Sequence, residues 1–206
     1  MNLTALATAL TLIAPPVAAD PTFADCPALP AGANPAEWRC EVLTSEATVS
    51  FGNVRELRLG TMRLTFAEGR LDNEYAQVVG ALRSEPTEVP GLPGTSVRFR
   101  YAGYSDFQSN DDRKGEIDLA AVFEGSLLPP GCESGPVHSV LRAAGPTQVV
   151  STDPLTLRFA TVDEQLSFPA TEGCGPLTRA LNHRLGLPSP SGNSYAQTTL
   201  VRLQSY

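Results

Sequence analysis

Apolar and polar side chains alternate along several short runs of this sequence, which is the pattern of β-strands that bury one face. The runs lie at 47–51, 97–101, 117–123, 155–159, 166–168 and 201–204. Elsewhere the chain is rich in glycine and proline, with 17 and 18 residues and no fixed period, as turn-rich β proteins are. We therefore predict a mainly β fold of about seven to nine strands, an antiparallel β-sandwich-like or open barrel domain.

The phase of the alternation changes once within a continuous segment. Apolar residues occupy odd positions at 57–59 and even positions at 62–66, and Gly60 and Thr61 lie at the change. One extra residue in a strand shifts the phase in this way. We therefore expect a β-bulge with Gly60 at the bend.

Two of the alternating runs are separated by a polar loop and are expected to form a hairpin. The register that places Phe99 opposite Ile117 also places Arg100 opposite Glu116. Apolar pairs then share one face and opposite charges share the other, which stabilises a pair of strands. Pattern and charge therefore favour the same register.

Helical signals are few. Apolar residues at 177–185 recur with helical spacing, Pro176 suits the first turn and Gly186 suits the end. The segment 75–82 also has helical spacing, although a Val-Val-Gly sequence interrupts it. One or two short helices are therefore expected.

The first 19 residues have the features of a secretory signal peptide. They contain no charged side chain, are apolar from Leu3 to Ile13, and end in Val-Ala-Ala before Asp20. We expect residues 1–19 to be a signal peptide and the protein to be periplasmic or secreted. An uncleaved anchor is the alternative, because the leader has no Lys or Arg near its start. No later segment is apolar enough to span a bilayer, so no membrane span is expected after cleavage.

The mature chain, 20–206, is predicted to be a single β-rich domain. The alternative is a pair of subdomains that meet near 125–131, where a Leu-Pro-Pro-Gly sequence could form a linker. A continuous sheet that crosses this segment fits the pattern equally well.

All four cysteines follow the leader, and an even number in an exported chain is typical of disulfides. They are Cys26, Cys40, Cys132 and Cys174. Three pairings are possible; we favour Cys26 with Cys40 and Cys132 with Cys174, which close the smallest loops. No two cysteines have the close spacing of a zinc site, so no metal is expected.

Acid–base chemistry has few candidates. The histidines are His138 and His183, and neither the Gly-x-Ser-x-Gly nor the Ser-x-x-Lys pattern of hydrolases occurs. We expect His183 on the polar side of the helix and His138 as a hydrogen-bonded ring. The loop 106–118 concentrates oxygen ligands, but Lys114 lies where a calcium loop needs a ligand, so a solvated hairpin loop is favoured over calcium.

The charge balance excludes one class of partner. Fifteen basic and 22 acidic side chains give a net charge of −7, and the arginines are scattered, so a nucleic acid partner is not expected. No cofactor motif occurs. The sequence therefore predicts a soluble, exported, non-catalytic binding or accessory protein of the cell envelope, whose partner is an envelope protein or a small ligand.

A hydrolase that acts on an extracellular polymer is the alternative function. It would use two carboxylates of the loop region as acid and base. The candidates are Asp106, Asp111, Asp112, Glu116 and Asp118.

Overall fold

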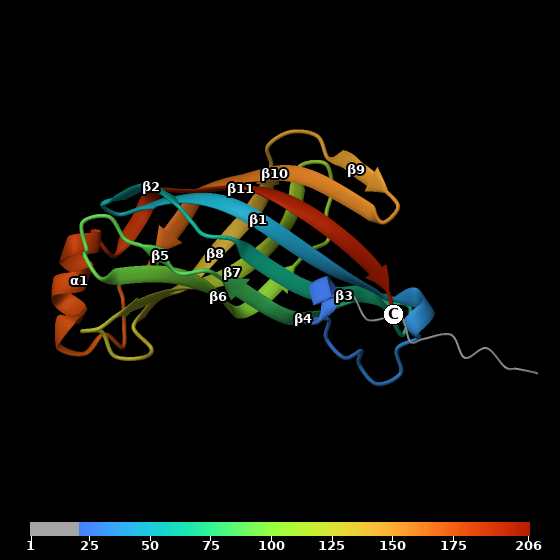
Figure 1. Cartoon of the computed structure of the whole chain (residues 1–206), viewed down its shortest axis with the longest axis horizontal. Helices are drawn as coiled ribbons and strands as arrows, with labels where there is room; N and C mark the ends of the chain where they lie inside the picture. Colours follow the sequence, from blue (N-terminus) through green and yellow to red (C-terminus); the bar gives the residue numbers. More distant parts are fainter. Residues whose placement is uncertain (1–20) are drawn as a thin grey trace, which may run out of the picture.

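Eleven antiparallel strands form one sheet that curls into a half-barrel, with one short helix at its end (Figure 1). The computed structural model describes residues 21–206, and the predicted signal peptide lies outside them. The strands are β1 (Arg39–Phe51), β2 (Val54–Arg58), β3 (Met62–Leu71), β4 (Glu74–Ser84), β5 (Thr87–Glu88), β6 (Thr95–Asp106), β7 (Arg113–Gly125), β8 (Glu133–Ala143), β9 (Gln148–Thr152), β10 (Leu155–Phe168) and β11 (Ser189–Ser205). The helices are the 3-10 turns η1 (Pro21–Phe23), η2 (Pro35–Glu37) and η3 (Gly175–Leu177), and the α-helix α1 (Thr178–Leu185).

The strand order brings the two margins of the sheet together. The order is β4-β3-β1-β11-β10-β8-β7-β6-β5, with β2 beside β1 and β9 beside β10. Strands β4 and β6 lie next to each other, and side chains of β4 accept hydrogen bonds there in place of backbone carbonyls. The Phe99 N–H donates to Ser84 Oγ at 3.2 Å, and the Phe107 N–H donates to Gln77 Oε1 at 2.9 Å. These bonds satisfy backbone donors that an open edge would leave unpaired.

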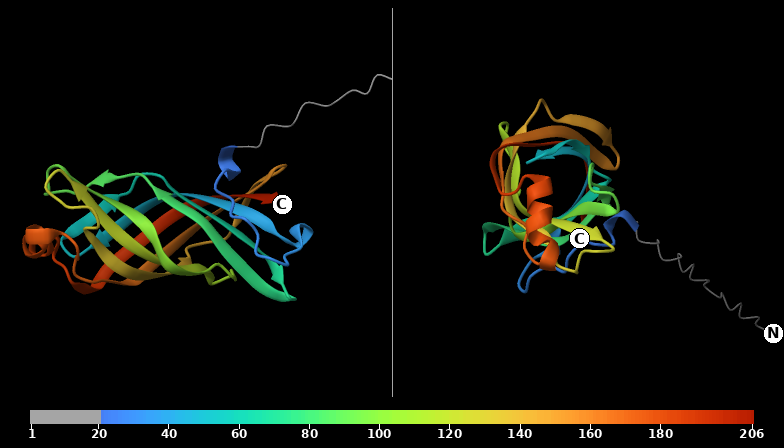
Figure 2. Two further views of the ribbon diagram at one scale, coloured as in Figure 1. Left: turned by 90° about the horizontal axis from the view of Figure 1, so that it is seen from below. Right: turned by 90° about the vertical axis from the view of Figure 1, so that its left-hand side faces the viewer.

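Aromatic side chains fill the closed half of the barrel. Phe51, Phe123 and Phe168 are buried, and the rings of Phe51 and Phe168 stack with centroids 4.8 Å apart. Helix α1 lies across this end (Figure 2) and buries Leu181 and Leu185. The barrel is therefore closed at the α1 end.

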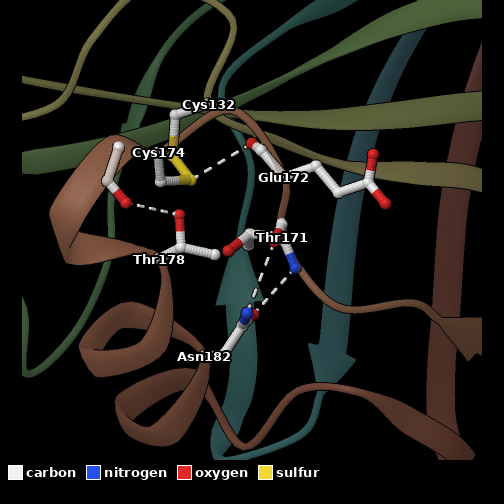
Figure 3. Close-up of a disulfide and its surroundings, with 7 residues drawn as sticks. Cys132, Thr171, Glu172, Cys174, Thr178 and Asn182 are labelled. Atoms are coloured by element: carbon white, nitrogen blue, oxygen red, sulfur yellow. Dashed lines mark hydrogen bonds between the residues drawn. A yellow bond between two sulfur atoms is a disulfide. The ribbon is translucent and has the colours of Figure 1, made fainter.

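Two disulfides hold peripheral segments to the sheet. Cys26 bonds to Cys40 on β1, and Cys132, just before β8, bonds to Cys174, just before η3. This is the pairing that the sequence favours. Close to the second disulfide, the Asn182 side chain accepts from the Thr171 N–H at 2.8 Å (Figure 3), which fixes α1 to the chain that leads into it.

Several sequence predictions are confirmed. The fold is mainly β with a half-barrel sheet, and α1 ends at Gly186 as expected, with that residue in a left-handed conformation. Across from β1, Thr48 pairs with Arg58 whereas Ser45 pairs with Met62. The strand opposite therefore holds one extra residue, as predicted for the bend at Gly60. The segment near 125–131 is the turn between β7 and β8, which pair with each other in the same sheet.

The second predicted helix is wrong, because the segment 75–82 belongs to strand β4. Thr65 pairs with Ala81 and Phe66 pairs with Val79, so a bulge leaves the glycine between them unpaired. A bulge shifts the side-chain phase by one residue. In this sequence the shift mimics helical spacing.

The predicted hairpin register is also wrong. Phe99 pairs with Ala121, four residues beyond Ile117, and Arg100 forms its ion pair with Glu133 on β8. The predicted strands are β6 and β7, but both run further into the polar loop than the alternation indicates. The register also shifts by two residues between Tyr101 and Ser105 on β6, an irregularity that the alternation does not reveal.

Candidate functional site

A cavity of about 200 Å³ lies inside the barrel at the end opposite α1. Its apolar wall comes from four strands, β1, β3, β10 and β11, and from the loop after β6. The side chains of this wall are Leu43, Phe66, Leu157, Phe159, Val201 and Leu203, with Phe107 from the loop after β6. These strands carry apolar residues at every second position, so their inward faces form one continuous surface.

Leu43 and Phe107 form the floor of this cavity, since both also line a deeper cavity of about 30 Å³. Phe107 is held in place by the ring of Phe66, which stacks on it with centroids 4.6 Å apart. Below the floor, the buried Tyr195 hydroxyl donates to Gln197 Oε1 at 2.7 Å. The space below the floor is therefore small, and the larger cavity is the one at the open end.

Two buried carboxyl groups line one side of the cavity. Glu41 lies on the inner face of β1, between its pairing partners Phe66 and Leu203, and is only 9% exposed. Arg39 Nε donates to Glu41 Oε1 at 2.8 Å, and Arg39 Nη2 donates to Glu68. The guanidinium of Arg39 therefore donates hydrogen bonds to both carboxyl groups.

The two carboxyl groups titrate differently. Burial raises the pKa of Glu41 to about 7, and the negative charge of Glu68 adds to the rise. Burial also acts to raise the pKa of Glu68, but the hydrogen bond from Tyr75 and the charge of Arg39 leave it below its usual value. The Tyr75 hydroxyl donates to Glu68 Oε2 at 2.5 Å. Near neutral pH Glu68 is therefore the carboxylate, and Glu41 is the group that gains or loses a proton.

The β9–β10 hairpin lies at the rim of the open end. Val149, Val150 and Leu155 are large apolar residues that remain exposed, with fractions of 63%, 50% and 41%. Leu155 also lines the cavity. The rim therefore extends the apolar wall toward the solvent.

Two other hollows are less suited to hold a ligand. A wide, open cleft on the outer face, about 640 Å³, is lined largely by small and polar residues such as Thr48 and Thr198. A cavity of about 170 Å³ beside α1 is lined by Leu128 and Leu181, and its one charged residue is Arg184. Among the hollows found in residues 21–206, the open-end cavity combines enclosure, an apolar wall and a buried ionisable group.

The loop carboxylates considered for catalysis lie away from this cavity. Arg113 pairs with Asp106 at 2.9 Å and with Glu116, and Asp118 Oδ1 lies 2.7 Å from His138 Nδ1. Asp111 and Asp112 are exposed in the turn before β7. Asp106, Glu116 and Asp118 are thus paired with Arg113 or His138, and none of the five carboxylates lines the cavity.

The two histidines and Lys114 are the other residues that the sequence analysis considered. His138 is hydrogen-bonded as expected, although it is exposed, and His183 is exposed on α1. Lys114 Nζ donates to the carbonyl of Asn110 at 2.7 Å, which makes it part of the hairpin turn. Within the described part of the chain, no group of three or more His, Cys, Asp or Glu side chains could hold a metal ion.

The sequence analysis missed Arg39, Glu41 and Glu68. The sequence does contain a signal for Arg39 and Glu41. Both occupy odd-numbered positions, as do the apolar residues Val49 and Phe51 in the alternating run that follows. Charged residues in the phase of a buried face are unusual, and they mark a cavity or a functional site.

Comparison of this chain with family models, with curated proteins and with solved structures finds no match. Within 21–206, no helix has the length and apolar character needed to cross a membrane.

Proposed function

We propose that this protein is an exported binding protein that holds a small amphipathic molecule in the open end of its half-barrel. The observation that carries the proposal is the cavity of about 200 Å³, in which the buried carboxyl group of Glu41 lies among the side chains of an apolar wall. Ligand sites are commonly preformed apolar cavities in which a few polar groups set the orientation.

The apolar wall and the carboxyl groups contribute different interactions to ligand binding. Burial of a ligand's apolar surface against Leu157, Phe159 and Leu203 supplies affinity, at about 25 cal/mol per Å². Glu41 and Glu68 supply hydrogen bonds that fix the polar end of the ligand. Because α1 closes the far end of the barrel, the ligand enters and leaves through the rim beside the β9–β10 hairpin.

The expected location outside the cytoplasm rests on the leader at 1–19 and on the two disulfides. Disulfides persist in the periplasm and in secreted proteins, where the environment is oxidising. A carrier or accessory role in the cell envelope follows from this location together with the cavity.

Fluorescence of N-phenylnaphthylamine, a neutral apolar dye, tests the proposal. We expect the dye to brighten on binding to the mature protein. The substitution Leu203→Trp fills the cavity from β11 and should weaken binding at least about tenfold. The matched control is Thr198→Trp, which adds the same side chain to the exposed outer face of the same strand and should leave binding unchanged.

Thermal unfolding of both variants shows whether they fold. Equal dye affinity for folded Leu203→Trp and for the wild type would refute binding in the open-end cavity. Loss of binding in Thr198→Trp alone would place the dye in the outer cleft and would also refute it.

A further inference from the structure

The open-end cavity is lined by two acidic and two basic side chains, but both carboxyl groups pair with the same cation, Arg39. Two carboxyl groups, Glu41 and Glu68, have side chains only 11% and 12% exposed. Their shared partner Arg39 is 55% exposed, so the guanidinium lies toward the solvent and the carboxyl groups lie toward the cavity. Buried carboxylates are stable only when opposite charges and hydrogen bonds compensate them.

Among residues 21–206, Arg39 is the one cation within ion-pair distance of Glu41 or Glu68. The titratable groups around Glu41 are Arg39 on β1, Glu68 on β3, Tyr75 on β4 and Lys114 on β7. The Lys114 ammonium is bound to the carbonyl of Asn110, and Tyr75 is a neutral donor to Glu68. Strands β10 and β11 contribute apolar residues to the wall. Ionisation of both carboxyl groups therefore leaves one of them without a full partner.

We infer that the ligand is a hydrophobic amine, with its ammonium group against Glu41 and Glu68 and its apolar body along the wall. This inference rests on the proposed function and names the class of ligand. A cation would complete the charge balance of the carboxyl pair, which Arg39 alone satisfies in part. An anionic head group would instead meet the carboxylate of Glu68, and the two negative charges would repel each other.

The aromatic rings at the base of the cavity also favour a hydrophobic amine as the ligand. Phe66 and Phe107 stack at the base of the cavity and present apolar surface and aromatic faces. Aromatic faces attract cations as well as apolar chains. An alkyl chain that carries an ammonium group would contact the apolar wall with its chain and the carboxyl groups with its charge.

Cation binding at this site has a predictable pH dependence. The pKa of Glu41 in the free protein is about 7, and a neighbouring ammonium stabilises its ionised form. Binding therefore releases a proton where Glu41 starts protonated. We expect the affinity to rise about tenfold between about pH 6 and about pH 8, and to level off above that range.

Titration calorimetry of the mature protein with three probes of equal chain length tests the inference. The probes are octylamine, octanol and octanoate, and octylamine remains a cation over the whole range. We expect octylamine to bind most tightly, octanoate most weakly, and the octylamine affinity to rise with pH. The substitution Glu41→Gln should remove the pH dependence and reduce the preference for the amine over octanol.

Glu46→Gln is the matched control, since Glu46 lies exposed on the outer face of the same strand, and it should bind as the wild type does. Tighter binding of octanol or octanoate than of octylamine overturns the inference about charge and leaves the proposed function standing. An octylamine affinity that is unchanged by pH and by Glu41→Gln also overturns it. Failure of all three probes and of the dye overturns the proposed function itself.

Discussion

Replacement of Glu41 by glutamine should stabilise the protein at alkaline pH. The pKa of Glu41 rises from 4.5 to about 7 on folding, chiefly because of burial. The folded state therefore binds this proton more tightly than the unfolded state, and the stability that it provides is lost as pH rises from about 4.5 to about 7. Each pKa unit corresponds to about 1.4 kcal/mol, so ionised Glu41 costs the folded state up to about 3 kcal/mol.

The coupling to Glu68 reduces this figure, because the lowered pKa of Glu68 favours the folded state where both groups are ionised. We therefore expect Glu41→Gln to raise the free energy of unfolding by about 1–3 kcal/mol at about pH 8, with little change at about pH 4.5. Urea unfolding of wild type, Glu41→Gln and the exposed control Glu46→Gln measures the difference. Equal destabilisation by Glu41→Gln at both pH values would refute the reasoning, since it would mean that Glu41 is a structural partner of Arg39 rather than an undercompensated acid.

Three further changes and one control, Gly91→Ala, test the fold by urea unfolding. The double substitution Cys132→Ser with Cys174→Ser should lower the free energy of unfolding by about 2–4 kcal/mol, and an unchanged midpoint would contradict the structural role of that bond. Gly52→Ala should cost about 2–3 kcal/mol, because its Cβ would lie 2.1 Å from the last helical carbonyl. Gly91→Ala, also at positive φ but in open space, should cost about 1 kcal/mol, and equal losses would refute the proposed clash. Phe168→Ala empties a fully buried site and should cost about 3–5 kcal/mol; a loss under about 1 kcal/mol would show that the site is not packed as described.

The alternation of side chains predicted the fold class because it reports which face of a strand is buried, a local property. It failed where a bulge interrupts the period. Gly80 lies between Val79 and Ala81 in a bulge, and its Cβ would meet the carbonyl of Asp25 at 2.2 Å. The reason for that glycine is a contact with a segment far away in the sequence, which periodicity cannot reveal.

The candidate site was harder to predict for the same reason. The cavity is assembled from β3, β1, β11 and β10, which pair in that order in the sheet, and from the loop after β6, which the curl of the sheet brings against them. The pattern could place Arg39 and Glu41 on an inner face. The contact of Arg39 with Glu68 depends on the register of β1 against β3, since Arg39 and Glu68 are paired residues. Neither residue's own sequence neighbourhood contains this information.

The most direct test of ligand binding at the open end is an amide NMR titration of the isotope-labelled mature protein with N-phenylnaphthylamine. Binding in the open-end cavity predicts that the largest shifts fall at 41–43, 157–159 and 201–203, which carry the wall of the cavity. Shifts confined to 92–95 and 177–184, beside α1, would contradict the account, because they would place the ligand in the cavity at the closed end.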